Sequence, residues 1–202
     1  DRSDGMWHVG RAAFRVGSAF VRQRNFVAPA LPILRRLRDQ TRETANLGVI
    51  DEGEVVVLTQ VESREIMRAI TRVGGRAPMV SSGMGKAIMA TYSDTDVDAI
   101  IRRHGMRKLT EKAITTPAAL KADLEETRKR GYAVDDEEYV VGLRCVAATV
   151  YNHQAEALCA ISISGLTARV TEDRVERLGW LVAEAARELT GIVGGTMPGA
   201  NI

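Results

Sequence analysis

Two neighbouring apolar runs constrain the fold of this chain more than any other part of its sequence. They are Leu143–Tyr151 and Glu156–Ser164, and the polar residues Asn152-His153-Gln154-Ala155 join them. Both runs are rich in Val, Ile, Ala and Thr. Runs of this length and composition, separated by polar turn residues, predict a β-hairpin.

The register of this hairpin predicts which side chains share a face. A turn centred on His153-Gln154 pairs Cys145 with Ser162 and Leu143 with Ser164. Because side chains alternate along a strand, one face carries five of them: Leu143, Cys145, Ala147, Ser162 and Ser164. The opposite face carries Val146, Val150, Cys159, Ile161 and Ile163. A thiol and two hydroxyls among small and apolar neighbours are typical of one wall of a small polar pocket.

Patterns elsewhere predict further strands and several helices. Three more strands are expected, Ala45–Ile50 and Glu54–Val61 on either side of the turn Asp51-Glu52-Gly53, and then Ile66–Val73. Helices are expected at Arg11–Arg24, at Val27–Thr41, from near Gly83, from Ser93 to His104, from Thr116 to Gly131, and from Thr171 to Ile192. Hairpins with helices before, between and after them predict an α+β fold with a mostly antiparallel sheet flanked by helices and preceded by a linker helix.

Composition is that of an ordinary globular protein. The 202 residues are 45% hydrophobic and 27% charged, which is enough to bury a core. No apolar run approaches the roughly 20 residues of a membrane span, and no signal peptide opens the chain, so no membrane contact is expected. Cys145 and Cys159 fall on opposite faces of the predicted hairpin, so we expect two thiols and a reducing, cytoplasmic location.

Positive charge is concentrated near the start of the chain. Up to Glu43 there are nine Arg residues against four Asp and Glu, although the whole chain carries a net charge of only +2. Such a segment is either the solvated surface of a helix or a chain end that lies close to DNA phosphates.

The segment Ser81-Ser82-Gly83-Met84-Gly85 is the first candidate for ligand binding. Serine is a common N-cap, and the unpaired N–H groups of a helix start bind carboxylates or phosphates when glycines let the ligand approach. The alternative is a tight strand-to-helix turn that needs a flexible backbone. The spacing differs from a Walker A loop, which argues against nucleotide binding.

Two further clusters are candidates. Cys145, Ser162 and Ser164 offer weak donors that suit a small oxygen-rich ligand, or they fill a tight sheet–helix interface. The acidic run Asp135-Asp136-Glu137-Glu138 is either a solvated turn or a segment that turns one or two carboxylates inward, where a single inward Asp could accept a hydrogen bond from a ligand hydroxyl.

The sequence gives little support for catalysis or for metal binding. His8, His104 and His153 lie far apart with no metal-ligand spacing, and no Cys-x-x-Cys occurs. Cys145 as a nucleophile would need a base, and His153 lies at the far end of its predicted strand. We therefore expect no catalytic residues, no metal and no cofactor, and an enzyme acting on a small keto acid is the least favoured hypothesis.

Four motifs in the same order resemble the effector-binding domain of the IclR (isocitrate lyase regulator) family of bacterial transcription factors. They are NLGVIDEGEVVVLTQVES, SSGMGKAIMA, RGYAVDDEEYVVGLRCVAATV and AISISG. The resemblance runs from about Trp7 to about Gly191 and implies a GAF-like (profilin-like) fold. It also implies that 1–25 is the end of a wing and a linker helix from a missing winged helix-turn-helix domain, and that 26–194 is the effector-binding domain. The residues of the tail, 195–202, predict a disordered end.

The same resemblance implies a function and a site. It points to the family branch that responds to glyoxylate, in which a small carboxylate effector is held by residues at the positions of Gly83, Met84, Asp135, Leu143, Cys145, Ser162 and Ser164. The expected partners are that effector, DNA through the missing domain, and other copies in a homodimer or homotetramer. Two alternatives stay open, a GAF-like dimerisation module without a ligand and a regulator of an aromatic acid such as protocatechuate.

Overall fold

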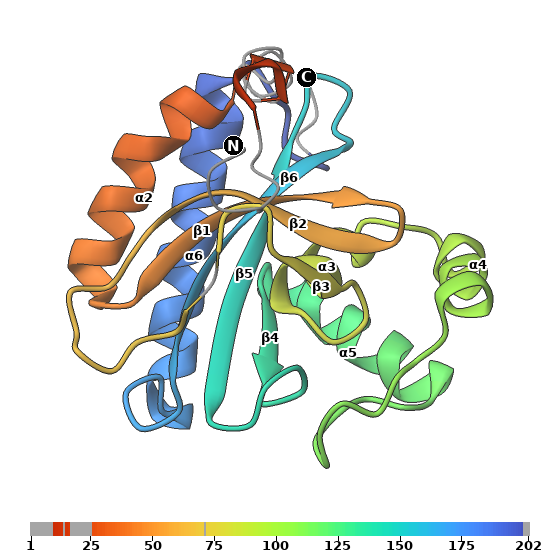
Figure 1. Cartoon of the computed structure of the whole chain (residues 1–202). Helices are drawn as coiled ribbons and strands as arrows, with labels where there is room; N and C mark the ends of the chain where they lie inside the picture. The colour runs from red at the N-terminus through yellow and green to blue at the C-terminus, as the bar shows by residue number, and fades with distance from the viewer. Residues whose placement is uncertain (1–9, 14, 17–25, 71, 200–202) are drawn as a thin grey trace.

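The computed structural model describes residues 10–13, 15–16, 26–70 and 72–199 (Figure 1). Its elements, in chain order, are α2 (Val27–Thr41), β1 (Thr44–Asp51), β2 (Glu54–Val61), β3 (Arg76–Pro78), α3 (Gly83–Met89), α4 (Asp94–His104), α5 (Pro117–Arg130), β4 (Ala133–Asp136), β5 (Leu143–Tyr151), β6 (Ala157–Leu166) and α6 (Glu172–Ile192). This confirms the predicted α+β class with an antiparallel sheet.

The sheet has six strands in the order β3-β2-β1-β6-β5-β4. Every neighbouring pair is antiparallel. The two longest strands, β5 and β6, lie inside the sheet, and the shortest, β3 and β4, form its edges. The hairpin predicted from the two apolar runs is therefore a central part of the sheet.

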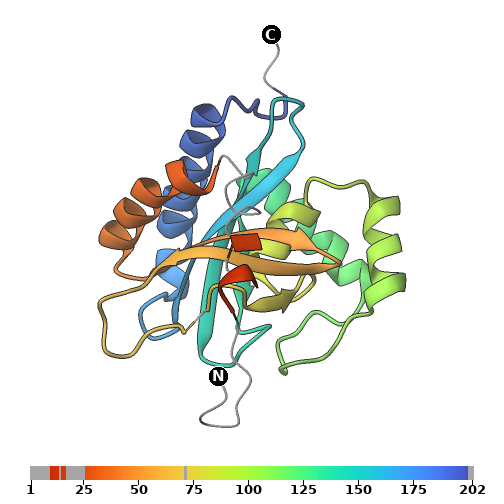
Figure 2. The same ribbon diagram turned by 45° about the horizontal axis from the view of Figure 1, so that its top comes forward.

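Helices α2 and α6 cover one face of the sheet, whereas α3, α4 and α5 lie on the other side (Figures 1 and 2). Helix α6 buries Leu178, Val182, Ala185 and Leu189, a spacing of three to four residues that brings them onto one face. They pack with Ile33, Leu34 and Leu37 of α2 and with Val146, Val150, Cys159, Ile161 and Ile163 of the sheet, in the largest hydrophobic core. Among the described residues, no helix has the length and apolar composition needed to cross a membrane.

Side-chain caps explain where the helices on the other side begin. The hydroxyls of Ser82, Ser93 and Thr116 accept hydrogen bonds from the backbone N–H groups of Gly85, Asp96 and Ala119. Gly131 ends α5 in the left-handed conformation that the sequence predicts there, with φ of 80°. Thr171 occupies the N-cap position of α6, but its side chain makes no capping hydrogen bond.

The predicted hairpin register is wrong by two residues. Cys145 pairs with Ser164 instead of Ser162, and Leu143 pairs with Leu166 instead of Ser164. The cause is an irregularity between Val150 and Tyr151, followed by a turn in which Ala155 has a φ of 60°. Since a shift of two residues keeps every side chain on its face, the predicted faces remain correct.

The predicted strand Ile66–Val73 is also wrong. This segment leads to a shorter strand, β3, and the backbone of Val57 bonds instead to Gly74 and Gly75. Ile66 is 96% exposed and Ile70 79% exposed. Apolar, β-branched composition predicts a strand only where the side chains pack against neighbours, and these side chains do not.

Both ends of the chain lie partly outside the described residues. Residues 11–13 and 15–16 are helical, and the rest of the predicted linker helix and the residues predicted as a wing fall outside. At the other end, Gly195 N donates to Thr190 O at 2.7 Å and Thr196 N donates to Asn152 O at 3.0 Å. The division into 1–25, 26–194 and 195–202 remains a prediction.

Candidate functional site

One cavity of about 320 Å³ contains all seven residues that the sequence singled out. It lies between the start of α3 and one face of the sheet, where side chains of β1, β4, β5 and β6 line it. Gly83 and Met84 contribute from α3, Asp135 from β4, and Leu143, Cys145, Ser162 and Ser164 from the central hairpin. The structure thus brings together residues that are up to 81 positions apart, 83 to 164, in the chain.

Asp135, Cys145 and Ser164 form a row across three strands. Asp135 pairs with Cys145, and Cys145 pairs with Ser164. The Cys145 thiol donates to the Ser164 hydroxyl, with Sγ and Oγ 3.1 Å apart. Burial and the nearby Asp135 carboxylate raise the pKa of this thiol above its ordinary value, so it stays protonated. It therefore acts as a hydrogen-bond donor and lacks the thiolate form that a nucleophile needs.

Asn46 on β1 is a cavity residue that the sequence did not reveal. Its side-chain Nδ2 donates to Ser162 Oγ at 3.3 Å and to Ser164 Oγ at 3.2 Å, and Asn46 is only 1% exposed. Because the two serine oxygens accept from Asn46, their own hydroxyl hydrogens are left to donate elsewhere. A single Asn inside an apolar strand carries little signal unless the partner strand is known.

One of the glycines at the start of α3 allows close packing. Gly83 lies against β5, and an added Cβ there would make ordinary contact, 3.5 Å from the Cβ of Cys145. At Gly85 a Cβ would overlap the backbone of Met79, so this position has to be glycine. The amides of Gly83 and Met84 belong to the first turn, where no intrahelical acceptor exists.

Asp135 is one of two buried carboxylates of the acidic run, the other being Glu138. It is 3% exposed, and its Oδ1 accepts from Glu138 N at 2.8 Å and from Tyr139 N at 3.3 Å. Burial raises the pKa of Asp135 to about 6. Asp136 and Glu137 instead form ion pairs with Lys112, which matches the solvated half of the prediction.

A buried lysine lies behind the cavity. Lys86 of α3 is fully buried and forms ion pairs with Glu138 and, at 3.0 Å, with Asp123 of α5. Burial raises the pKa of Glu138 to about 7 in spite of this lysine. The sequence predicted Lys86 only as a helix former and Glu138 only as part of an acidic turn, because one lysine in a helix does not reveal its partners.

Apolar side chains line much of the rest of the cavity. Met84 and Leu143 are joined there by Val55, Val57, Ile70 and Val140, and two arginines, Arg72 and Arg76, also contribute. Arg76 forms ion pairs with Asp51 and Glu54, whereas Arg72 is exposed. The cavity therefore combines a polar group of side chains with apolar walls.

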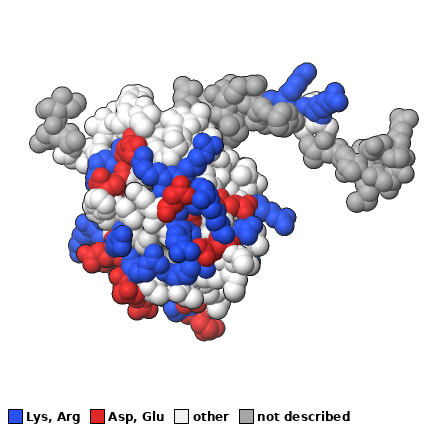
Figure 3. All heavy atoms as spheres, turned by 90° about the vertical axis from the view of Figure 1, so that its left-hand side faces the viewer, with Lys and Arg blue, Asp and Glu red and all other residues white. Residues whose placement is uncertain are grey.

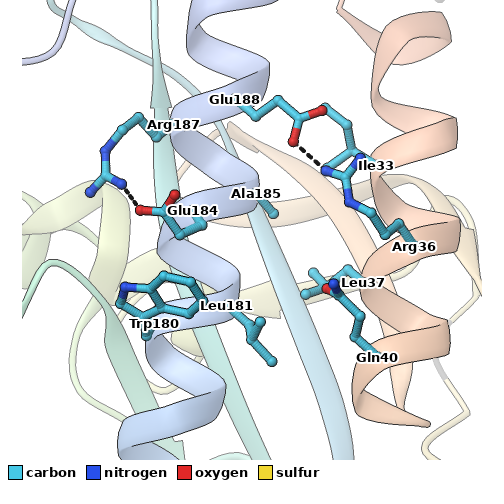
Figure 4. Close-up of a pocket in the computed structure, with 10 residues that line it drawn as sticks. All are labelled: Ile33, Arg36, Leu37, Gln40, Trp180, Leu181, Glu184, Ala185, Arg187 and Glu188. Carbon is cyan, nitrogen blue, oxygen red and sulfur yellow. Dashed lines mark hydrogen bonds and ion pairs between the residues drawn. The ribbon is translucent and has the colours of Figure 1, made fainter.

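A second hollow, of about 370 Å³, lies between the outer sides of α2 and α6 (Figure 4). Its charged side chains are already paired, Arg36 with Glu188 and Arg187 with Glu184. The surface on this side of the molecule mixes basic and acidic groups, as Figure 3 shows. This groove contains none of the predicted site residues.

Comparisons with known proteins show the family of this chain. The family described as "Bacterial transcriptional regulator IclR C-terminal" matches residues 18–190. This chain belongs to the IclR family. The "Acetate operon repressor" of Salmonella typhimurium is 44% identical over 194 residues, which cover 95% of this chain and 71% of that protein. The "Transcriptional repressor IclR" of Escherichia coli is 43% identical over 193 residues, covering 95% and 70%.

Solved structures of IclR-type regulators have the same fold. The IclR of Thermotoga maritima has a TM-score of 0.86 and 30% identity, and it covers 96% of this chain and 78% of its own. The C-terminal domain of the E. coli regulator KdgR has a TM-score of 0.75 and 30% identity, covering 84% and 98%. The IclR-family chain described here is the effector-binding domain of a transcriptional regulator, and the expectation that it is not an enzyme is confirmed.

Proposed function

We propose that this domain senses a small 2-oxo or 2-hydroxy acid such as glyoxylate and thereby alters DNA binding by the regulator. The observation that carries the proposal is the convergence of Asp135, Cys145, Ser162 and Ser164 on one cavity beside the start of α3. Two serine hydroxyls and two first-turn amides provide donors for the oxygens of a carboxylate, without a full opposing charge.

A ligand of this size can still bind usefully. At the ceiling of roughly 1.5 kcal/mol per heavy atom, the few atoms of a glyoxylate ion allow micromolar affinity. That ceiling is approached only when nearly every oxygen is bonded, and the donors contributed by α3, β5 and β6 make this feasible. The relatives named as repressors support a role in controlling transcription.

Binding alters DNA occupancy only if the effector prefers one arrangement of the protein over another. We propose that the segment 11–24, which the sequence predicts as a linker helix, transmits this preference. The matched relatives are longer than this chain, which covers 71% and 70% of them. An N-terminal winged helix-turn-helix domain and assembly as a homodimer or homotetramer are part of the proposal.

Calorimetry with glyoxylate, glycolate, pyruvate and protocatechuate tests the effector class. Heat from one or more of the three small acids, with little from protocatechuate, is the expected result. The variant Cys145→Ala/Ser162→Ala should lose binding by at least about tenfold, since each lost hydrogen bond contributes roughly 1 kcal/mol. The control is Thr149→Ala, a buried change on the same strand outside the cavity.

The aromatic-acid alternative has one structural observation in its favour. A volume of about 320 Å³ with Val55, Val57, Ile70 and Val140 along its walls has room for more than a two-carbon acid. Clear heat from protocatechuate and none from the small acids would select it. If none of the four acids binds, and the double variant instead unfolds, the dimerisation module becomes the better account.

A further inference from the structure

Asp135 presents its carboxyl group to the cavity in a fixed orientation. Two backbone N–H groups, of Glu138 and Tyr139, hold its Oδ1 at 2.8 and 3.3 Å. Because Oδ1 already accepts two hydrogen bonds, Oδ2 is the oxygen that can bind a proton. The side chain is 3% exposed, so little solvent compensates its charge.

The groups that face Asp135 do not give it a cation of its own. Lys86, on α3, is shared between Glu138 and Asp123, so three carboxyl groups surround one ammonium group. From β5 comes the protonated thiol of Cys145.

Most of the other charged side chains near Asp135 are already paired with other groups. Asp136 forms ion pairs with Lys112 and Arg144, and Glu137 with Lys112. Of the two arginines that line the cavity, Arg76 already forms ion pairs with Asp51 and Glu54, and Arg72 is exposed, so water and salt screen its charge.

A carboxylate effector therefore enters a region that already holds excess negative charge. Like charges at short distance in a buried site destabilise each other, and a proton on one of the carboxyl groups removes this repulsion. Burial already raises the pKa of Asp135 to about 6 and that of Glu138 to about 7, so protonation near neutral pH costs little.

We propose that Asp135 recognises the effector in its acid form, donating a hydrogen bond from its carboxyl O–H to an effector oxygen, and that binding takes up one proton from solution. This inference rests on the proposed function. The balance is simple, since one carboxylate anion and one proton enter the site together and no covalent bond to the effector forms or breaks.

Calorimetry of the unmodified chain with glyoxylate tests the proton directly. The titration is run at about pH 8 in phosphate and in Tris, two buffers whose ionisation enthalpies differ. We expect observed enthalpies that differ by the equivalent of about one proton per effector, and a Kd that rises about tenfold per pH unit above pH 7. Equal enthalpies in both buffers, or a Kd independent of pH, would overturn the inference.

Two variants test which residue takes up the proton. Asp135→Asn keeps a donor in place of the acid and should retain binding while losing the buffer dependence. Arg102→Gln removes an exposed cation of α4 outside the cavity and should leave both binding and proton uptake unchanged. Undiminished uptake in Asp135→Asn, or its loss in Arg102→Gln, would show that another group takes up the proton. Binding without proton uptake contradicts only this inference, whereas no binding of any small acid between about pH 5.5 and pH 8 contradicts the proposed function as well.

Discussion

Neutral hydrogen-bond donors line part of the cavity. Asn46 bonds both serines, and Cys145 bonds Ser164, so each side chain fixes the direction of the next. Such a chain of hydrogen bonds discriminates strongly between ligands, because a ligand that leaves one buried member unpaired loses affinity. Three of the residues that the sequence singled out, Cys145, Ser162 and Ser164, belong to this set of hydrogen bonds. Asn46 connects the two serines.

Replacing Asn46 with alanine tests that connection. The variant loses the bonds to Ser162 and Ser164, so we expect the free energy of unfolding to fall by about 1–3 kcal/mol. Affinity for the effector should fall by about tenfold or more because the serine hydroxyls are no longer held. Urea unfolding and calorimetry measure the two effects. Gln40→Ala, an exposed amide on α2, should change stability by less than about 0.5 kcal/mol.

At the scale of elements, α3 is positioned from three directions. Its glycines pack against Met79 and β5, Ser82 caps its start, and Lys86 ties it to Glu138 and to α5. A helix of seven residues is too short to be stable alone, so these tertiary contacts hold it in place. The geometry of the cavity therefore depends on residues that do not line it.

A pair of glycine substitutions tests how tightly α3 is packed. In Gly85→Ala the new Cβ overlaps the backbone of Met79, and we expect a loss of about 2 kcal/mol or more. Gly191→Ala places the same methyl group in open space on α6, where better helix propensity should add up to about 1 kcal/mol. Thermal unfolding compares the two. If Gly85→Ala did not lower the stability relative to Gly191→Ala, α3 would have to move easily away from Met79.

The sequence predicted most elements because their signals are local. Ser82, Ser93, Thr116 and Gly131 carry cap and turn chemistry within a few residues, and the alternation of Leu143–Tyr151 defines its faces. The exact register was not predictable, because it depends on an irregularity at Tyr151 that has no sequence signature. Long-range partners also have no local signature. The pairing of Lys86 with Glu138, for example, exists only after the chain has folded.

For the whole molecule, the buried acids predict how stability changes with pH. The folded chain holds protons on Asp135 and Glu138 up to about pH 6 and 7, where the unfolded chain has already released them. The stabilisation from this difference is present at about pH 4 and is lost as pH rises towards 7, with an upper limit of about 3 kcal/mol for each group. Urea unfolding across this range should show the decline, and Asp135→Asn/Glu138→Gln should flatten it. A variant curve parallel to that of the unmodified chain would assign the effect to other groups.

The shortness of the two border strands has a consequence for the behaviour of the protein in concentrated solution. A sheet recruits further chains through the unused amide and carbonyl groups of its outermost strands. Here those strands are β3, with three residues, and β4, with four residues that include two aspartates. The ladder available for open-ended fibre growth is thus brief at both borders, so self-association is directed to side-chain surfaces, which can form closed assemblies.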